Sequence, residues 1–279
     1  MDQKILILGA KGMLGSALAK VFSDKNPILL DYLELDIADQ KNLEEKLNEL
    51  KPTLIINAAA YTDVDGAESN KELAMKVNGE AVGYLAEVAK KLGAILIHYS
   101  TDYVFDGEKK EGYTEKDKAN PLNVYGQSKL QGEELLQQKG EMFYLIRSSW
   151  LYGENGKNFI DTILTKAGQE PKLKVVNDQF GKPTYTKDLA RKTREIIDQM
   201  KPCGIYHVTN KTKEGGISWY ELAKRAVELK NLKCEVVPCS TFEFPRPAKR
   251  PKYSALVNTK LGPVRHWREA LKEYLNHEL

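Results

Sequence analysis

A tyrosine and a lysine four positions apart have the clearest potential for chemistry in this sequence. Tyr125 and Lys129 would lie one turn apart on one face of a helix, for which Asn120 is a suitable N-cap and Pro121 a suitable first residue. An ammonium beside a phenol favours the phenolate and lowers the phenol pKa, which is about 10 without neighbours. The pair predicts a tyrosine that donates a proton to a developing alkoxide near neutral pH. The same spacing is also common on ordinary surface helices.

Hydroxyl and carboxyl groups follow the predicted strand Ile95–Tyr99. In α/β sheets, ligands bind at the carboxyl ends of the strands, which is where Ser100, Thr101 and Asp102 stand. A hydroxyl at this position can hydrogen-bond to the substrate oxygen that Tyr125 protonates. The two features together favour an active site over an incidental tyrosine–lysine spacing.

Three regularly spaced glycines predict a site for a dinucleotide. The segment Gly9-Ala10-Lys11-Gly12-Met13-Leu14-Gly15 lies between the first predicted strand and the first predicted helix. One glycine permits the tight turn, a second lets backbone N–H groups approach a pyrophosphate, and the third allows close helix–strand packing. The glycine spacing alone would be weak support, but the strand–turn–helix context strengthens it. We assign cofactor binding to Gly9, Lys11, Gly12, Met13, Leu14 and Gly15.

Acidic residues after the second predicted strand bear on the choice of cofactor. Asp31 ends that strand, where a carboxylate can accept hydrogen bonds from both ribose hydroxyls of NAD and would repel the 2′-phosphate of NADP. Lys11 favours the opposite preference, because it could approach that phosphate. Asp36 and Ile37 follow at a position suited to contact with adenine. The sequence thus predicts NADH or NADPH as the cofactor, with a slight preference for NADH.

Short apolar runs alternate with amphipathic stretches in the first half of the chain. Uniformly apolar runs are typical of parallel strands covered on both faces. They occur at residues 5–8, 28–30, 54–56, 95–97 and 143–146. Helical periodicity separates them, including a long helix over 73–92 and another near 122–138. The pattern predicts an α/β fold with a doubly wound parallel (Rossmann-like) sheet.

After about residue 150 the pattern becomes irregular, because eight of the eleven prolines lie there. We predict an NAD(P)-binding domain over 1–149, to which the chain returns near 184–205. A smaller C-terminal α/β domain for the substrate would occupy most of 150–279. Helices are expected over about 186–200, 217–230 and 266–276.

Composition argues against several other classes of protein. The 42 Lys and Arg nearly balance the 39 Asp and Glu, so the net charge of +3 gives no reason to expect a nucleic-acid partner. No apolar run approaches the roughly 18 residues of a membrane-spanning helix, and the block at 5–8 is too short for a secretory signal. The three cysteines and four histidines lack metal-ligand spacing. We therefore expect a cytoplasmic protein with no metal site and no membrane partner.

These residues give the chain a resemblance to a known family. It is similar to the extended short-chain dehydrogenases/reductases, and more narrowly to the dTDP-4-dehydrorhamnose reductases. The stretches STDYVFDG, from Ser100, and NDQFGKPT, from Asn177, are the most specific to these reductases. Beyond the glycine turn, the resemblance is carried by Asn57–Thr62 with Val64-Asp65, His98–Phe105, Pro121–Gly126 with Lys129, Arg147 with Trp150, Asn177–Gly181 with Pro183-Thr184, and Arg250-Pro251 with Ser254.

The resemblance implies hydride transfer from NAD(P)H to the C4 keto group of a dTDP-sugar substrate, dTDP-4-dehydro-L-rhamnose. It also implies that Tyr125 donates the proton, Lys129 holds the nicotinamide ribose and Thr101 orients the carbonyl. Positions that match the family's cofactor site are Ala58, Ala60, Tyr61 and Thr62. Positions that match its substrate site are Thr101, Asp102, Tyr103, Trp150 and Arg250.

Arg250 belongs to a cationic loop with Arg246, Lys249 and Lys252, and such a loop suits a diphosphate. One departure from the family concerns assembly. Some members dimerise through Mg²⁺ held partly by a glutamate two residues past the third glycine, where this chain has Ala17. Any homodimer is therefore not expected to be linked by Mg²⁺ through the first helix.

Two other functions stay open at this point. The first is another sugar-nucleotide enzyme, an epimerase or a dehydratase, and Asp102 keeps the dehydratase in view. The second is a non-catalytic regulatory subunit like that of methionine adenosyltransferase. The intact set of Thr101, Tyr125 and Lys129 argues against this second function without excluding it.

Overall fold

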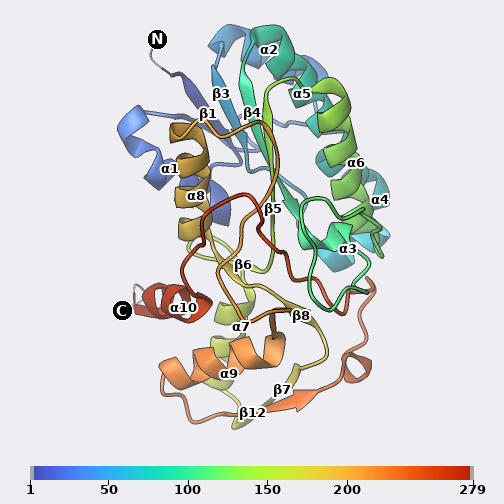
Figure 1. The fold of residues 1–279 in the computed structure, drawn as a ribbon, viewed down its shortest axis with the longest axis vertical. Coiled ribbons are helices and arrows are strands. Elements are labelled where there is room, and N and C mark those ends of the chain that lie inside the picture. The colour runs from blue at the N-terminus through green and yellow to red at the C-terminus, as the bar shows by residue number, and fades with distance from the viewer. Residues whose placement is uncertain (1–2, 277–279) are drawn as a thin grey trace.

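A six-stranded parallel sheet forms the centre of the computed structural model, which describes residues 3–276. The strands lie in the order β10-β5-β4-β3-β1-β2, and every neighbouring pair is parallel (Figure 1). Their bounds are β1 Ile5–Leu8, β2 Ile28–Leu30, β3 Leu54–Asn57, β4 Ile95–Thr101, β5 Phe143–Ser148 and β10 Gly204–His207. The order reverses direction at β1, as in doubly wound sheets, so the predicted fold class is confirmed.

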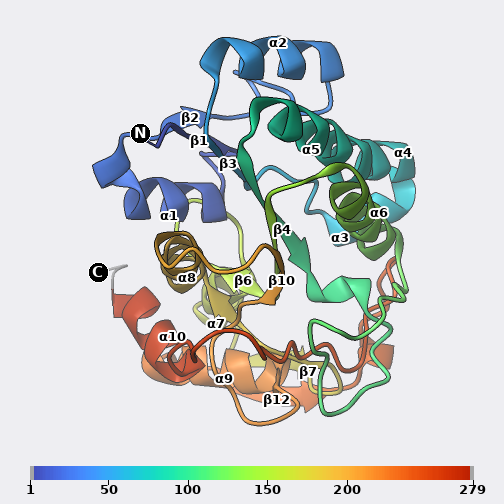
Figure 2. The same cartoon turned by 45° about the horizontal axis from the view of Figure 1, so that its top comes forward.

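Helices cover both faces of this sheet, which explains why its strands are mostly apolar. One face packs against α1 (Met13–Val21) and α8 (Thr186–Asp198), and the other against α2 (Gln40–Leu50), α5 (Ala81–Leu92) and α6 (Val124–Lys139). Figure 2 shows the two layers on either side of the strands. The residues of β1 and β3 are at most 1% exposed, as expected for strands enclosed by two helical layers.

The helix that carries Tyr125 begins later than the sequence suggested. The expected N-cap, Asn120, instead donates a side-chain hydrogen bond to Asp106 Oδ2. Asn123 caps α6, because its Oδ1 accepts from the Gly126 amide at 2.7 Å. Tyr125 therefore lies in the first turn of α6, and Lys129 one turn further on.

The long helix expected over 73–92 is present and contains one π-helical turn. After the short helix α3 (Val64–Ser69), helical structure runs without a break through α4 (Lys71–Met75), the π turn over Lys76–Glu80 and α5 to Leu92. Asn78 lies within the π turn, and its amide exchanges hydrogen bonds with the backbone of Tyr61 at 2.9 Å. The turn thus ties this helix to the loop that follows β3.

The second half of the chain forms a smaller layer of helices beside three short two-stranded sheets. The strand pairs are β6 (Leu151–Tyr152) with β9 (Thr184–Tyr185), β7 (Lys172–Val176) with β12 (Glu235–Cys239), and β8 (Phe180–Gly181) with β11 (Ile217–Ser218). The helices are α7 (Phe159–Ala167), α9 (Trp219–Leu229) and α10 (Trp267–Asn276). A cluster of aromatic and aliphatic side chains forms their common core, including Tyr152, Tyr185 and Tyr274. Residues 186–207 leave this layer and supply α8 and β10 to the large sheet.

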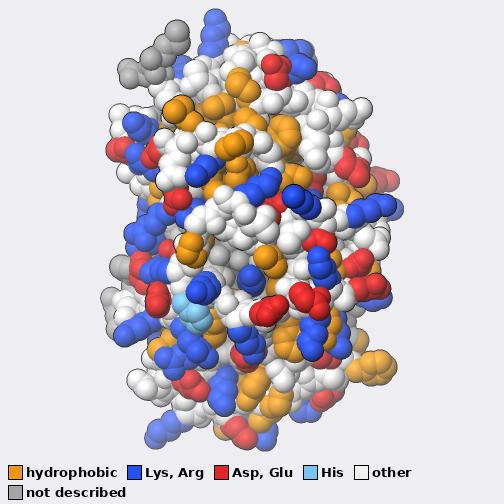
Figure 3. Space-filling model, in the orientation of Figure 1, with side chains coloured by type: hydrophobic (Ala, Val, Ile, Leu, Met, Phe, Trp, Pro, Cys, Tyr) orange, Lys and Arg blue, Asp and Glu red, His pale blue; other side chains and the backbone are white. Residues whose placement is uncertain are grey.

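The surface carries charges of both signs. Figure 3 shows Lys and Arg interspersed with Asp and Glu over the face in view. Among the described residues, no helix is long and apolar enough to cross a membrane.

Candidate active site

One cavity of about 650 Å³ brings together most of the residues singled out in the sequence. It lies at the carboxyl ends of β1, β3, β4 and β5, where a doubly wound sheet binds its ligands. Predicted residues that line it are Gly9, Gly12, Met13, Leu14, Asp31, Asp36, Ile37, Ala58, Ala60, Thr62, Thr101, Tyr125, Lys129 and Trp150. Predicted residues outside its lining are Lys11, Gly15, Tyr61, Asp102, Tyr103 and Arg250.

The glycine turn packs too closely for side chains. Gly9 has φ +70°, and a Cβ there would lie 2.7 Å from the Ala59 amide nitrogen. A Cβ at Gly15 would lie 2.0 Å from the Gly9 carbonyl oxygen, so this glycine serves the packing of α1 against the turn rather than the cavity wall. The first amides of α1 have no acceptor within the helix, which leaves them available to an anion.

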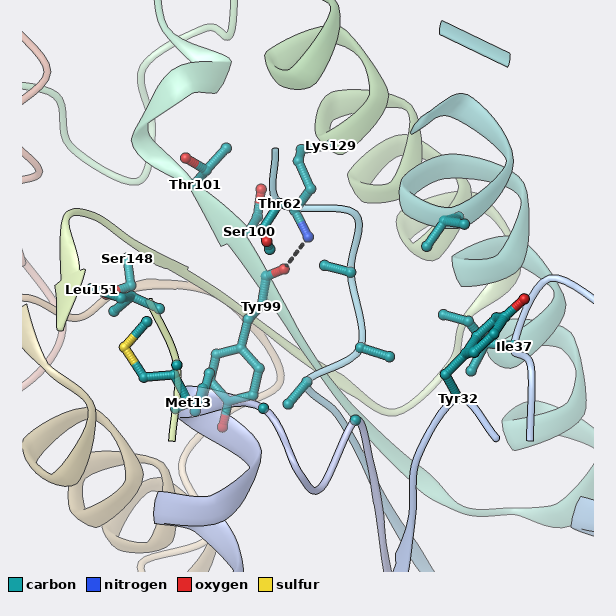
Figure 4. A pocket seen from close by; sticks show the side chains of 18 of the residues that line it. Met13, Tyr32, Ile37, Thr62, Tyr99, Ser100, Thr101, Lys129, Ser148 and Leu151 are labelled. Atoms are coloured by element: carbon teal, nitrogen blue, oxygen red, sulfur yellow. Dashed lines mark hydrogen bonds between the residues drawn. The ribbon is translucent and has the colours of Figure 1, made fainter. Parts of the chain in front are cut away.

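Acidic residues surround one end of the cavity. Asp31 Oδ2 accepts from the Lys11 amide at 2.7 Å, and Asp31 Oδ1 accepts from the Tyr32 amide at 2.7 Å. The Lys11 ammonium is 2.7 Å from Glu34 Oε1. Sequence reasoning missed Glu34, because its partner is 23 positions away. Figure 4 shows Tyr32 and Ile37 at this end, far from Thr101 and Lys129.

Lys129 reaches the opposite end of the cavity from α6. Its Nζ donates to the carbonyl oxygen of Tyr99 at 2.6 Å, the dashed contact in Figure 4. Burial lowers the pKa of Lys129 to about 8, and the carboxylate of Glu133, one turn further along α6, partly opposes this shift. Glu133 is itself held by Arg147 in a buried ion pair, with Arg147 Nε 2.8 Å from Glu133 Oε1.

Tyr125 differs from the expectation in the direction of its pKa shift. Burial raises the pKa of the phenol to about 12, and the hydroxyl of Thr101, which hydrogen-bonds to it, lowers the pKa only in part. The expected lowering by Lys129 is not seen, because the ammonium is directed to the Tyr99 carbonyl and desolvation dominates. At neutral pH the phenol therefore keeps its proton.

Thr101 lines the cavity beside the phenol, and Asp102 follows it just outside the lining. Thr101 is the last residue of β4, and its hydroxyl donates to Asp102 Oδ1 at 3.1 Å. Asp102 is 2% exposed, and its Oδ2 has no hydrogen-bond partner. Burial raises the pKa of Asp102 to about 7, and the nearby hydroxyls of Ser254 and Thr101 oppose the shift only in part. A buried carboxyl with a free oxygen at a site of this kind is a typical feature of functional centres.

An aromatic stack closes the cavity on the side of the smaller layer. Trp150 has φ +48° and stacks on Trp219, with ring centroids 3.4 Å apart and planes inclined by 8°. A Cβ at Gly181 would lie 2.5 Å from the Trp150 ring, so the glycine makes room for it. Sequence reasoning found Trp150 but missed Trp219, which begins α9 far away in the chain.

Arg250 lies away from the cavity in an ion pair that the sequence did not suggest. Its guanidinium makes two parallel contacts with Asp65 of α3, one of them between Nη2 and Oδ2 at 2.9 Å. Arg250 also hydrogen-bonds to Tyr103, whose ring lies edge-on to Tyr125 with centroids 5.9 Å apart. Arg250, Tyr103 and Tyr125 thus form a continuous line of contacts. Within residues 3–276, no group of three or more metal-ligating side chains is present.

Comparison with known proteins assigns the family. The family model described as the RmlD substrate binding domain matches residues 3–279. The dTDP-4-dehydrorhamnose reductase of Aggregatibacter actinomycetemcomitans is 41% identical to this chain, and the match covers 96% of this chain and 97% of that protein. The crystal structure of the Clostridium acetobutylicum dTDP-4-dehydrorhamnose reductase is 43% identical, with a TM-score of 0.94 over 99% of both chains.

The chain belongs to the dTDP-4-dehydrorhamnose reductase family. The resemblance seen in the sequence is thereby confirmed, and with it the oxidoreductase class. A further dTDP-4-dehydrorhamnose reductase, from Bacillus anthracis, was solved in complex with NADP and superposes with a TM-score of 0.95 at 34% identity, covering 99% of this chain and all of that one.

The residues of this dTDP-4-dehydrorhamnose reductase family member fit a nicotinamide dinucleotide. The glycine turn offers a cradle without side chains, next to the free amides of α1. At the other end, the hydroxyls of Ser100 and Ser148 are buried without a hydrogen-bond partner, and both residues line the cavity. Polar atoms of this kind suit a carboxamide. Ser148 was not predicted, although it ends β5 in the same way that Thr101 ends β4.

Proposed function

We propose that this protein reduces the C4 keto group of dTDP-4-dehydro-L-rhamnose with NADH or NADPH to give dTDP-L-rhamnose. The observation that carries the proposal is that Thr101, Tyr125 and Lys129 line one cavity, whose wall continues through the glycine turn. Membership in the dTDP-4-dehydrorhamnose reductase family supports this choice of substrate.

Tyr125 is the proton donor. When bound, the reduced nicotinamide supplies a hydride to the ketone carbon, which leaves negative charge on the ketone oxygen. Because the pKa of the phenol is raised to about 12, Tyr125 holds its proton at neutral pH and can transfer it to the more basic alkoxide. The hydroxyl of Thr101, which hydrogen-bonds to the phenol, orients the same oxygen.

Lys129 provides a positive charge at this end of the cavity, and Glu133 helps to keep it charged. The ammonium of Lys129 stays near the end of β4 through its bond to the Tyr99 carbonyl, from where it would hold the nicotinamide ribose. Its pKa of about 8 keeps it mostly charged at neutral pH, and Glu133 favours the charged form.

The nucleotide-sugar would bind between the large sheet and the smaller layer formed by the second half of the chain. The flat ring of Trp150, held against Trp219, offers a rigid apolar wall to one face of the sugar. Asp102 and Tyr103 directly follow Thr101 in the chain and, as the family resemblance implies, would contact the bound substrate. When the substrate binds, the guanidinium of Arg250 would leave Asp65 and pair with the diphosphate. Arg246, Lys249 and Lys252 would add positive charge around it. The reaction takes place in the cytoplasm, and a homodimer would need no metal at the first helix.

The decisive assay combines the purified protein with dTDP-4-dehydrorhamnose and NADH or NADPH. We expect loss of the absorbance of the reduced nicotinamide, with one equivalent oxidised per equivalent of dTDP-L-rhamnose, identified by the configuration at C4. Product formation with tightly bound NAD⁺ and no net consumption of cofactor would instead indicate an epimerase or dehydratase. Co-purification with a synthetase and no turnover of the ketosugar would indicate a regulatory subunit.

A further inference from the structure

A small network of charges centred on Glu34 adjoins Asp31 at the adenosine end of the cavity, just outside the residues that line it. Oε1 of Glu34 is 2.7 Å from the ammonium of Lys11, and its Oε2 accepts from the backbone amide of Asp31 at 3.0 Å. The Glu34 amide in turn donates to the Asp31 carbonyl at 2.9 Å. Glu34 is thus fixed by its own backbone and side chain in a position where its carboxylate pairs with the exposed ammonium of Lys11.

Asp31 holds the backbone of Lys11, whereas Glu34 holds its side chain. The Lys11 amide donates to Asp31 Oδ2 at 2.7 Å, so the backbone and the side chain of Lys11 each engage a carboxylate. Asp31 and Tyr32 line the cavity, and Tyr32 is 69% exposed. An acid at the end of the second strand is where a dinucleotide fold meets the adenosine ribose, and so the 2′ position.

The charge balance at this end is negative. Lys11 carries one positive charge between Asp31 and Glu34, whereas a 2′-phosphate would add between one and two further negative charges, roughly −1.5 to −2. Among the described residues that line the cavity, the cations are Lys129 and Lys157. Lys129 lies at the opposite end (Figure 4), and Lys157 follows Gly156, which packs on Met13 at the start of α1. Among the described residues, neither of these lysines forms an ion pair or a hydrogen bond with Asp31.

We propose that Glu34 is a specificity-determining residue, which makes the protein bind NADH more tightly than NADPH by occupying the ammonium of Lys11. The inference rests on the proposed function, since it concerns the cofactor of that same site. It assigns to Asp31 the recognition of the ribose hydroxyls and to Glu34 the exclusion of the phosphate. Both residues are needed, because Lys11 without Glu34 would be free to pair with a 2′-phosphate.

The test is the dissociation constant of each reduced cofactor, measured by the fluorescence of the bound nicotinamide with no sugar present. The unmodified protein should bind NADH more tightly. Glu34→Gln should tighten NADPH binding about tenfold while leaving NADH within about twofold, which is the size of one charge-assisted hydrogen bond. Asp31→Ala should also shift the preference toward NADPH, but with weaker NADH binding.

Two controls separate this role from a general change in surface charge. Glu49→Gln removes an acid from a comparable exposed pair with Lys46 on α2, and it should change neither constant. Glu34→Gln combined with Lys11→Met should lose the gain in NADPH affinity. An unchanged NADPH constant in Glu34→Gln, or a gain that survives the loss of Lys11, would overturn the inference and leave the proposed reduction intact. Failure of the unmodified protein to bind either cofactor would overturn both.

Discussion

The two ends of the cavity are built from the same residue types under opposite conditions of exposure. At the adenosine end, the side chains of Lys11 and Glu34 are 68% and 43% exposed, and their ion pair faces water. At the other end, Lys129 and Thr101 are 3% and 6% exposed, and hydroxyls lie buried without partners. Both ends hold a lysine near a carboxylate, yet water screens one pair and is excluded from the other.

This difference in exposure separates recognition from chemistry. An exposed pair contributes little to stability, so the carboxylate of Glu34 matters at this end for which ligand Lys11 can bind. In the buried end, desolvation moves the pKa values of Tyr125, Lys129 and Asp102 to about 12, 8 and 7. Shifts of this kind are typical of sites of proton transfer, because a buried group exchanges its proton with the bound ligand rather than with solvent.

The largest expected effect is on turnover and comes from the buried end. Tyr125→Phe removes the donated proton while keeping the ring against Tyr103. We expect kcat to fall about a thousandfold, within the range for loss of a general acid, while the dissociation constants of the cofactors stay within about threefold. Tyr84→Phe, which removes a hydroxyl bound to Glu80 on the surface of α5, is the matched control and should keep normal turnover. Near-normal turnover of Tyr125→Phe would show that another group supplies the proton.

The next effect sharpens the contrast between buried and exposed ion pairs on one helix, α6. Glu133→Gln leaves the buried guanidinium of Arg147 without its counter-charge. We expect the free energy of unfolding, measured in urea, to fall by about 3 kcal/mol. Glu87→Gln breaks the partly exposed pair with Lys139 and should lower the free energy of unfolding by less than about 1 kcal/mol. Equal losses in the two variants would refute the contrast.

Glu133→Gln has a second readout that a purely structural role would not give. Because Glu133 raises the pKa of Lys129, its removal should lower that pKa below about 8. Lys129 would then lose its charge at lower pH, so cofactor affinity should begin to fall at a lower pH than in the unmodified protein. Glu87→Gln should leave this pH profile in place.

The fold and the glycine turn could be predicted because their determinants are local. A buried strand reads as consecutive apolar residues, and the turn reads as glycines at fixed spacing, so neither needs knowledge of distant segments. The same holds for Tyr125 and Lys129, which are neighbours on one helix. The start of that helix was less certain, because Asn120 and Asn123 are equally good caps in isolation and only the contact with Asp106 decides between them.

The features that sequence reasoning missed depend on contacts between distant segments. Arg250 is 185 positions from Asp65, and Trp150 meets Trp219 only because the smaller layer folds back on the cavity. The direction of the Tyr125 pKa shift belongs to the same class. Spacing on a helix places an ammonium near a phenol, but the degree of desolvation depends on how the end of β4 packs over both.

The smallest expected effect concerns Asp102 and links the buried end to stability. The pKa of this carboxyl is about 7 in the folded protein against an ordinary value of 3.8. Between these two values the folded state holds a proton that the unfolded state has released, so the contribution of Asp102 to the free energy of unfolding falls as pH rises toward 7 and is constant above it.

Asp102→Asn removes this titration and keeps a side chain of the same size. Between pH 5 and pH 8, the unmodified protein should lose roughly 2 kcal/mol more of its free energy of unfolding than the variant does. Urea unfolding of both proteins at the two pH values measures this, and other titrating groups cancel in the difference. If the two proteins lost the same amount, Asp102 would be ionised at neutral pH as an exposed acid is, and the buried end of the cavity would be wetter than its packing indicates.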